Sequence, residues 1–226
     1  MRLRTSAMAR SFRWVAAVVA TTTAATLIVQ PAWAASTYSA PLRTAVSRLV
    51  VASEVHTGYN RALFPHWIDA DHNRCNTRNE VLIAEATTKP KVSSTCALSG
   101  GRWYSYYDNR YWTRTSDLDI DHVVPLAEAW ESGARQWTTS RRQAYANDLG
   151  DSRTLAAVTD NVNQSKGDRD PAAWMPPYAG ARCRYLGDWV AVKIRWRLTV
   201  DRAEKAALTS WANKCANTTI RVTYAF

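Results

Sequence analysis

Hydrophobic residues recur at every third or fourth position in several parts of this chain of 226 residues. Apolar side chains at that spacing share one face of a helix, and such a face packs against a core. The pattern predicts helices in four stretches, residues 41–55, 76–86, 185–198 and 201–215. Asn76 and Asp201 stand at the starts of two of them, where their side chains can accept from free backbone amides as N-caps.

Residues 102–124 follow a different pattern, because aromatic and β-branched residues replace the helical spacing. Asp108 and Asn109 lie between two such runs, and this residue pair is typical of a turn. We expect a strand, a turn and a second strand here, with the second strand ending near His122. Pro125 follows shortly afterwards and cannot donate to a strand ladder.

Shorter helices are predicted where polar caps and glycines bracket apolar residues. They occupy residues 126–134, 138–149, 160–166 and 170–174. Gly133 and Gly167 end two of these helices, and Ser140 and Gln143 have capping-box spacing in another. Residues 219–226 are expected to form a strand or an extended tail. The expected fold class is therefore α+β, with helices dominant.

The first 34 residues have the order of a secretory signal peptide. Four arginines and no acid precede the apolar stretch 14–29, and the small residues Ala32 and Ala34 follow it. A membrane anchor is the alternative, but the stretch is short for a bilayer and four threonines dilute it. We therefore expect cleavage after Ala34 or Ala35, and a secreted, extracellular protein that does not associate with a membrane. Residues 35–226 are predicted to form a single domain that begins with a short tail, residues 35–40.

The charge of the chain indicates a polyanionic partner. Removing the four arginines of the leader lowers the net charge from +10 to +6. Nucleic acid, an anionic cell wall and an acidic membrane surface all fit a basic secreted domain. Charge does not choose among them.

Four cysteines remain after the leader is removed, and an even number in an exported chain predicts two disulfides. Three pairings are possible. We favour Cys75–Cys96 and Cys183–Cys215, because each closes a local unit of the chain. The second pair would tie together a C-terminal helical hairpin over about residues 183–215.

The stretch DLDIDHVVPLAEAW, residues 117–130, carries the candidate chemistry. A histidine beside a carboxylate can act as a general base near neutral pH. In an ideal strand Asp119 and Asp121 share one face while His122 lies on the other. We therefore expect the chain to bend at Asp121–His122 if the two are to act together. An isolated Asp-His pair at a strand end is more often structural than catalytic.

The same stretch, taken with NQSKGDRDPAAWMP some 40 residues later, resembles the HNH endonucleases of the His-Me finger (ββα-metal) superfamily. It is most similar to the secreted branch grouped with the GmrSD-type nuclease domain. CNTRNEVLIAEA and WYSYYD resemble that branch as well, so the resemblance covers roughly residues 65–180. It implies a ββα-metal core at about residues 100–178, to which further helices and the C-terminal hairpin are added.

The resemblance also implies a role for each residue that matches its motifs. His122 matches the general base, and Asp121 and Asn163 match the ligands of a divalent cation, with Mg²⁺ expected and Mn²⁺ as the alternative. Thr154 stands where HNH proteins usually carry an asparagine that orients the base. The implied reaction is hydrolysis of DNA, or of RNA, with low sequence specificity.

Four further residues have a functional and a structural interpretation side by side. Lys166 lies three positions after Asn163 and can contact phosphate or remain a solvated lysine. Arg78 can bind phosphate through its planar guanidinium or pair with a nearby glutamate. Asp119 and Glu128 are expected to be outer carboxylates of the site or structural partners.

The leading prediction is a secreted, monomeric, metal-dependent endonuclease. The main alternative is a non-catalytic basic binding protein for nucleic acid or cell wall, which the threonine at position 154 favours. A toxin delivered into competitors is a third possibility.

Overall fold

The computed structural model describes residues 36–225, so the predicted leader lies outside the described residues. The α-helices are α1 (Leu42–Arg48), α2 (Thr77–Glu85), α3 (Leu126–Glu131), α4 (Thr139–Ala146), α5 (Asp160–Lys166), α6 (Arg182–Trp196) and α7 (Arg202–Lys214). The strands are β1 (Thr37–Pro41), β2 (Lys91–Val92), β3 (Leu98–Ser99), β4 (Trp103–Ser105), β5 (Arg110–Trp112), β6 (Leu118–His122), β7 (Leu155–Thr159) and β8 (Thr219–Thr223). The mixed α+β class is confirmed.

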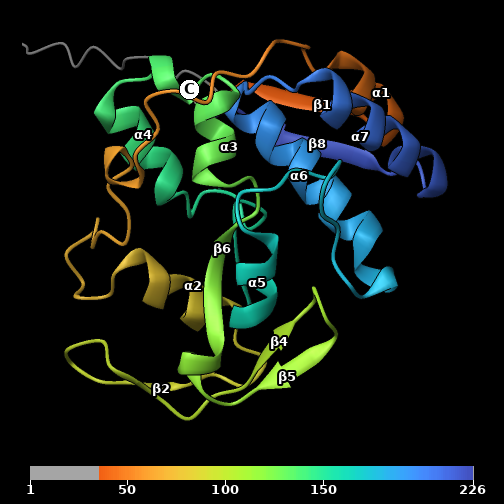
Figure 1. Ribbon diagram of the computed structural model, residues 1–226. Helices are drawn as coiled ribbons and strands as arrows, with labels where there is room; N and C mark the ends of the chain where they lie inside the picture. Colours follow the sequence, from red (N-terminus) through yellow and green to blue (C-terminus); the bar gives the residue numbers. More distant parts are fainter. Residues whose placement is uncertain (1–35, 226) are drawn as a thin grey trace, which may run out of the picture. The chain divides into compact units, whose positions relative to one another are not determined.

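The strands pair two by two, and the pair β6–β7 positions the candidate site. These strands are antiparallel, with Asp121 opposite Ala156 and His122 opposite Leu155. The chain passes from β7 directly into α5, which ends at Gly167, a glycine with φ of +57°. Residues that carry a side chain rarely adopt that backbone conformation, so glycine is suited to end the helix. Figure 1 shows α5 and α2 beside β6, and both helices contact this strand.

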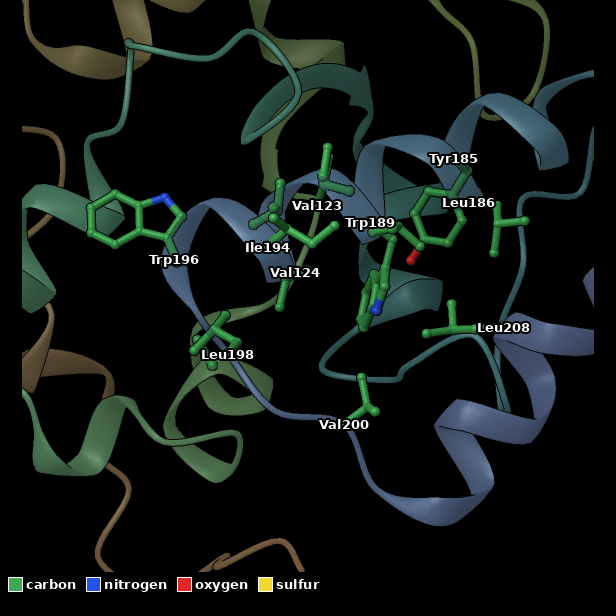
Figure 2. Close-up of a cluster of buried hydrophobic side chains, with 14 of the residues drawn as sticks. Val123, Val124, Tyr185, Leu186, Trp189, Ile194, Trp196, Leu198, Val200 and Leu208 are labelled. Atoms are coloured by element: carbon green, nitrogen blue, oxygen red, sulfur yellow. The ribbon is translucent and has the colours of Figure 1, made fainter. Parts of the chain in front are cut away.

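The larger hydrophobic core surrounds α6, whose middle and C-terminal parts are buried almost all round. Figure 2 shows Tyr185, Trp189 and Ile194 from this helix together with Val123 and Val124, which directly follow β6. Because residues next to His122 are anchored in this core, the end of β6 is held firmly. The side chains of α7 and of the pair β1–β8 complete the cluster.

A smaller core lies between α2 and the β6–β7 pair. Val81 and Leu82 of α2 pack with Trp103, Leu118 and Ile120. The indole of Trp103 donates to the Leu82 carbonyl over 2.6 Å. Alternate residues of β6 thus serve this core, which leaves its two aspartates to face elsewhere.

Both favoured disulfides are present, Cys75–Cys96 and Cys183–Cys215. The first ties the segment before α2 to the segment before β3. The second ties the start of α6 to the residue after α7, as expected for a stapled hairpin. Among the described residues, no helix is long and apolar enough to cross a membrane.

Several predicted elements have different bounds. The first helix ends at Arg48, because Leu49 is extended and Ala52 instead donates to the Val200 carbonyl over 2.9 Å. The run 102–124 is not one hairpin: β4 and β5 pair around a turn with Asn109 at φ of +58°, and β6 pairs with β7.

Two smaller differences concern short polar segments. Residues 170–174 form only a turn, in which the Asp170 side chain accepts from the amides of Ala172 and Ala173. The N-cap of α4 is Thr138, not Ser140, and its hydroxyl accepts from the Arg141 amide. The predicted tail at residues 35–40 contributes most of β1, which pairs with β8.

Candidate active site

A small cavity of about 180 Å³ lies at the end of β6, between the start of α3 and the C-terminal half of α5. Asp121 and His122 line it from the strand, and Asn163 and Asp168 from α5 and the turn after it. Arg61, from a short helical turn far upstream, lines the same space. Residues from three separate segments of the sequence therefore meet here.

His122 is almost completely buried, with 4% of its surface exposed. Its Nε2 lies 2.9 Å from the carbonyl oxygen of Ala146, at the C-terminal end of α4. A carbonyl can only accept, so Nε2 carries the proton and Nδ1 of the neutral ring is left as a proton acceptor. Burial lowers the pKa of His122 to about 3, so the ring is neutral at physiological pH.

Aromatic rings enclose the imidazole of His122. Trp67 stacks on it with ring centroids 5.6 Å apart and an interplanar angle of 26°. Tyr145 stacks at 6.3 Å and 24°. These contacts limit rotation of the imidazole, because a tilted imidazole would clash with one of the two stacked rings.

Asp121 is buried and both of its oxygens have partners. Oδ1 accepts from the ammonium of Lys166 over 2.8 Å, and Oδ2 accepts from the hydroxyl of Tyr107 over 2.5 Å. Lys166 is fully buried and also donates to the His122 carbonyl over 3.0 Å. Burial raises the pKa of Asp121 and lowers the pKa of Lys166, and in each case the charge of the partner opposes the shift.

Asn163 lies one helical turn before Lys166 on α5. Its amide nitrogen donates to Oδ2 of Asp119 over 3.2 Å. Helix α5 thus presents an amide to Asp119 and an ammonium to Asp121, which are two residues apart on β6. The amide oxygen of Asn163 remains as a further acceptor at this wall of the cavity.

The expected bend at Asp121–His122 is absent, and that prediction was wrong. Both residues lie in the regular β6–β7 ladder, and the amide of Val123 still donates to the Thr154 carbonyl over 3.0 Å. The two side chains contact different elements, Asp121 turning to α5 and His122 to α4. Both nevertheless line the same cavity, which lies at the end of the strand between α3 and α5.

Residues 76–211 match the family described as GmrSD restriction endonucleases, C-terminal domain. The chain belongs to this family. A protein of Arthroderma benhamiae described as an uncharacterized secreted protein is 52% identical over 158 residues, which covers 70% of this chain and 76% of that protein. The predicted secretion is thereby confirmed. No solved structure matches the chain.

Within this GmrSD-type domain, the side chains of Thr154 and His122 hydrogen-bond to different partners. Its hydroxyl donates to Oδ2 of Asp148 over 2.9 Å, and both residues are buried. Arg195 and the indole of Trp196 also donate to the Asp148 carboxylate. Thr154 therefore belongs to a buried polar cluster next to the site, and the Ala146 carbonyl takes the position of the histidine's orienting partner.

Arg78 and Glu128 lie outside the cavity. The guanidinium of Arg78 donates to the carbonyls of Thr115 and Leu118, over 3.0 and 2.9 Å. The buried Glu128 binds Lys193 and accepts from Ser132 over 2.6 Å. Glu128 therefore has the structural partners that were its alternative interpretation. Arg78 also has internal partners, but they are backbone carbonyls and not the expected glutamate, Glu80 or Glu85.

Two charged residues at the cavity were not singled out from the sequence, Arg61 and Asp168. Both are exposed, Arg61 in a short helical turn and Asp168 in the turn after α5, where apolar periodicity gives no signal. The only usable signal for Arg61 was its place in the aromatic loop TGYNRALFPHW. Asp168 directly follows the glycine that ends α5.

A separate group of side chains that could hold a metal ion is formed by Glu54, His56 and Glu131. Their ligand atoms are within 4.8 Å of one another, and His56 Nδ1 is 2.9 Å from Glu131 Oε1. This group shares no residue with the lining of the His122 cavity. It is therefore not part of the candidate active site.

Proposed function

We propose that this protein is a secreted endonuclease that hydrolyses phosphodiester bonds of DNA, with RNA as the alternative substrate. The main support is the environment of His122: a neutral imidazole, with Nε2 fixed on a backbone carbonyl, lines a small polar cavity. Membership of a restriction-endonuclease family supports the same reaction. The pair β6–β7 followed by α5 is consistent with the ββα-metal core that the sequence motifs imply.

His122 is proposed to take a proton from the attacking water on Nδ1. The water oxygen then forms a bond to phosphorus while the bond from phosphorus to the leaving 3′ oxygen breaks, and that oxygen takes a proton from solvent water. Donation from Nε2 to Ala146 keeps Nδ1 unprotonated beforehand. The Ala146 carbonyl also stabilises the resulting imidazolium, because its oxygen continues to accept the hydrogen bond from Nε2–H.

The oxygen donors at the cavity fit a hard divalent cation such as Mg²⁺ or Mn²⁺. Asp121 and Asn163 are the proposed ligands, with Asp119 beside Asn163. When bound, such an ion would neutralise charge on the phosphoryl oxygens. Lys166 already balances the charge of Asp121, so the cation and the ammonium compete for the same carboxylate.

Arg61 is the proposed contact for the substrate phosphate, because it is exposed and lines the cavity. An exposed guanidinium can form paired hydrogen bonds with phosphate oxygens. The net charge of +6 after loss of the leader favours approach of a polyanion. A backbone-directed site of this kind implies low sequence specificity.

Cleavage of plasmid DNA and of single-stranded RNA by the purified mature protein, with Mg²⁺ or Mn²⁺ and with EDTA, tests the proposal. His122→Ala should lower cleavage by about 10²–10⁴-fold, the usual contribution of a general base. His56→Ala is the matched control, because His56 is an exposed histidine outside the cavity. Equal activity of His122→Ala and wild type would remove His122 from the mechanism.

The alternative function is binding of nucleic acid without cleavage. It is favoured by the engagement of both Asp121 oxygens with Lys166 and Tyr107, which would have to share these oxygens with any bound cation. Wild-type protein that retards plasmid on a gel but leaves it intact with either cation would establish the alternative.

A further inference from the structure

Trp67, whose ring stacks on His122, has an unusual backbone conformation. Its φ is +58°, in the left-handed region that residues other than glycine rarely adopt. The indole is half-buried and stacks on His122. A bulky residue stays in such a conformation only when its surroundings fix it there.

Asn147 supplies much of that fixation. Its amide nitrogen donates to the Pro65 carbonyl over 2.8 Å, and its amide oxygen accepts from the Ile68 amide over 3.1 Å. These two bonds hold both ends of the segment Pro65–Ile68, which contains Trp67. The same oxygen accepts from the hydroxyl of Thr77 over 2.8 Å, so the segment is also tied to the start of α2.

Asn147 is also the residue after Ala146, whose carbonyl faces His122. Its amide nitrogen donates to the Gln143 carbonyl over 2.8 Å, and its backbone amide donates to the same oxygen over 3.2 Å. These bonds cap the C-terminus of α4 and fix the direction of the last carbonyls. One residue therefore holds, through its backbone amide and its side chain, both the peptide whose carbonyl accepts from His122 and the segment whose ring stacks on it.

We infer that Asn147 and Trp67 are positioning residues for His122: Asn147 anchors the Ala146 carbonyl and the Trp67 segment, and Trp67 holds the imidazole in the plane that this carbonyl requires. The inference rests on the proposed nuclease function. It places the role expected of Thr154 on a neighbouring asparagine that acts through the backbone and through Trp67.

Steady-state kinetics on a defined duplex substrate tests this inference. Trp67→Ala and Asn147→Ala should each lower kcat by about 10–100-fold with KM changed less than about twofold, because misplacing a catalytic group costs rate. Trp67→Phe keeps a stacked ring and should recover most of the activity. Trp112→Phe is the matched control, since Trp112 is a half-buried tryptophan that donates to Thr159.

The decisive measurement is the double variant with His122→Ala. If Trp67 and Asn147 act only through His122, adding either substitution to His122→Ala should change the residual kcat by less than about twofold. Losses that multiply with that of His122→Ala would overturn the inference. Asn147→Asp, which keeps the acceptor oxygen and loses the amide donor, provides a second variant if Asn147→Ala does not fold.

NMR of the His122 side-chain nitrogens separates this inference from the proposed function. Wild type should show one tautomer with the proton on Nε2, and Trp67→Ala and Asn147→Ala should show a mixture of tautomers. This readout does not depend on activity. A single unchanged tautomer in both variants would contradict the positioning role, whereas inactive wild-type protein would contradict the nuclease proposal alone.

Discussion

At the residue scale, the buried pair of Asp121 and Lys166 determines how the cavity can work. An ammonium with no exposed surface neutralises a carboxylate at the wall of the site. Removing one member of such a pair leaves an uncompensated buried charge, which is costly. A divalent cation near Asp121 would compensate that charge in a second way.

Lys166→Met, which keeps the length of the side chain, tests this competition. Without metal the variant should lose about 3–5 kcal/mol of unfolding free energy, because Asp121 becomes an unpaired buried charge. Added Mg²⁺ or Mn²⁺ should then raise its melting temperature more than that of wild type. The double variant Lys166→Met/Asp121→Asn should recover stability without responding to metal. Equal metal responses of wild type and Lys166→Met would exclude Asp121 as a ligand.

Substitutions of Arg61 and Arg78 should have different effects, one on KM and the other on the melting temperature. Arg61→Ala should raise KM about tenfold, equivalent to losing one hydrogen bond to a charged group, ~1.5 kcal/mol. Its melting temperature should not change, because Arg61 is exposed. Arg78→Ala should lower the melting temperature instead, since two backbone carbonyls lose their donor. A raised KM in Arg78→Ala alone would reverse the two assignments.

The sequence predicted the residues of the candidate site better than their partners. Asp121, His122 and Asn163 reach one cavity because short motifs fix their places on a strand and a helix. The pairing of Lys166 with Asp121 joins residues 45 positions apart, and the contact between His122 and Ala146 joins a side chain to a backbone group. The first contact depends on how distant segments pack, and side-chain patterns carry no signal for the backbone partner of the second, so neither contact was predictable.

At the element scale, helices with apolar rows and polar caps were predicted well. Asn76 caps α2 and Asp201 caps α7 through the expected amides, because these bonds are local. The errors fall where distant contacts decide. The first predicted helix stops early since Val51 bridges Val200, and β6 leaves the hairpin to pair with β7.

Glu85 of α2 should make the stability of the fold depend on pH. Oε2 of Glu85 accepts from the Ala157 amide over 2.9 Å, and burial raises the pKa of Glu85 to about 7. Between its ordinary pKa of 4.5 and about 7, the folded state binds more protons than the unfolded state. The contribution of Glu85 to stability therefore falls as pH rises through this window.

Glu85→Gln keeps an acceptor for Ala157 and removes the titration. The unfolding free energy of the variant relative to wild type should rise by about 1–2 kcal/mol between pH 4.5 and 8, after allowance for solvent screening. Urea denaturation at several pH values measures it. A difference between the two proteins that stays constant with pH would show that Glu85 does not titrate in this window.

At the scale of the whole molecule, the two ends of the described chain pair with each other. Strands β1 and β8 pair, so residues 37–41 close over residues 219–223. The buried Lys193 joins Glu128 of α3 to Glu204 of α7, which couples the helix after the His122 strand to the C-terminal hairpin. Helix α3 and the C-terminal hairpin are therefore joined through one buried group of charges.

The chain without its leader is basic, with a net charge of +6. A basic protein that binds phosphates releases counterions, so its affinity for DNA should fall steeply with salt. We expect KM for duplex DNA to rise about tenfold or more between ~50 and ~200 mM NaCl, with kcat nearly unchanged. Because Arg61 is the proposed phosphate contact, the salt slope of Arg61→Ala should be smaller by about one unit. An unchanged slope would mean that Arg61 contacts no phosphate, and a KM independent of salt would contradict nucleic acid as the substrate.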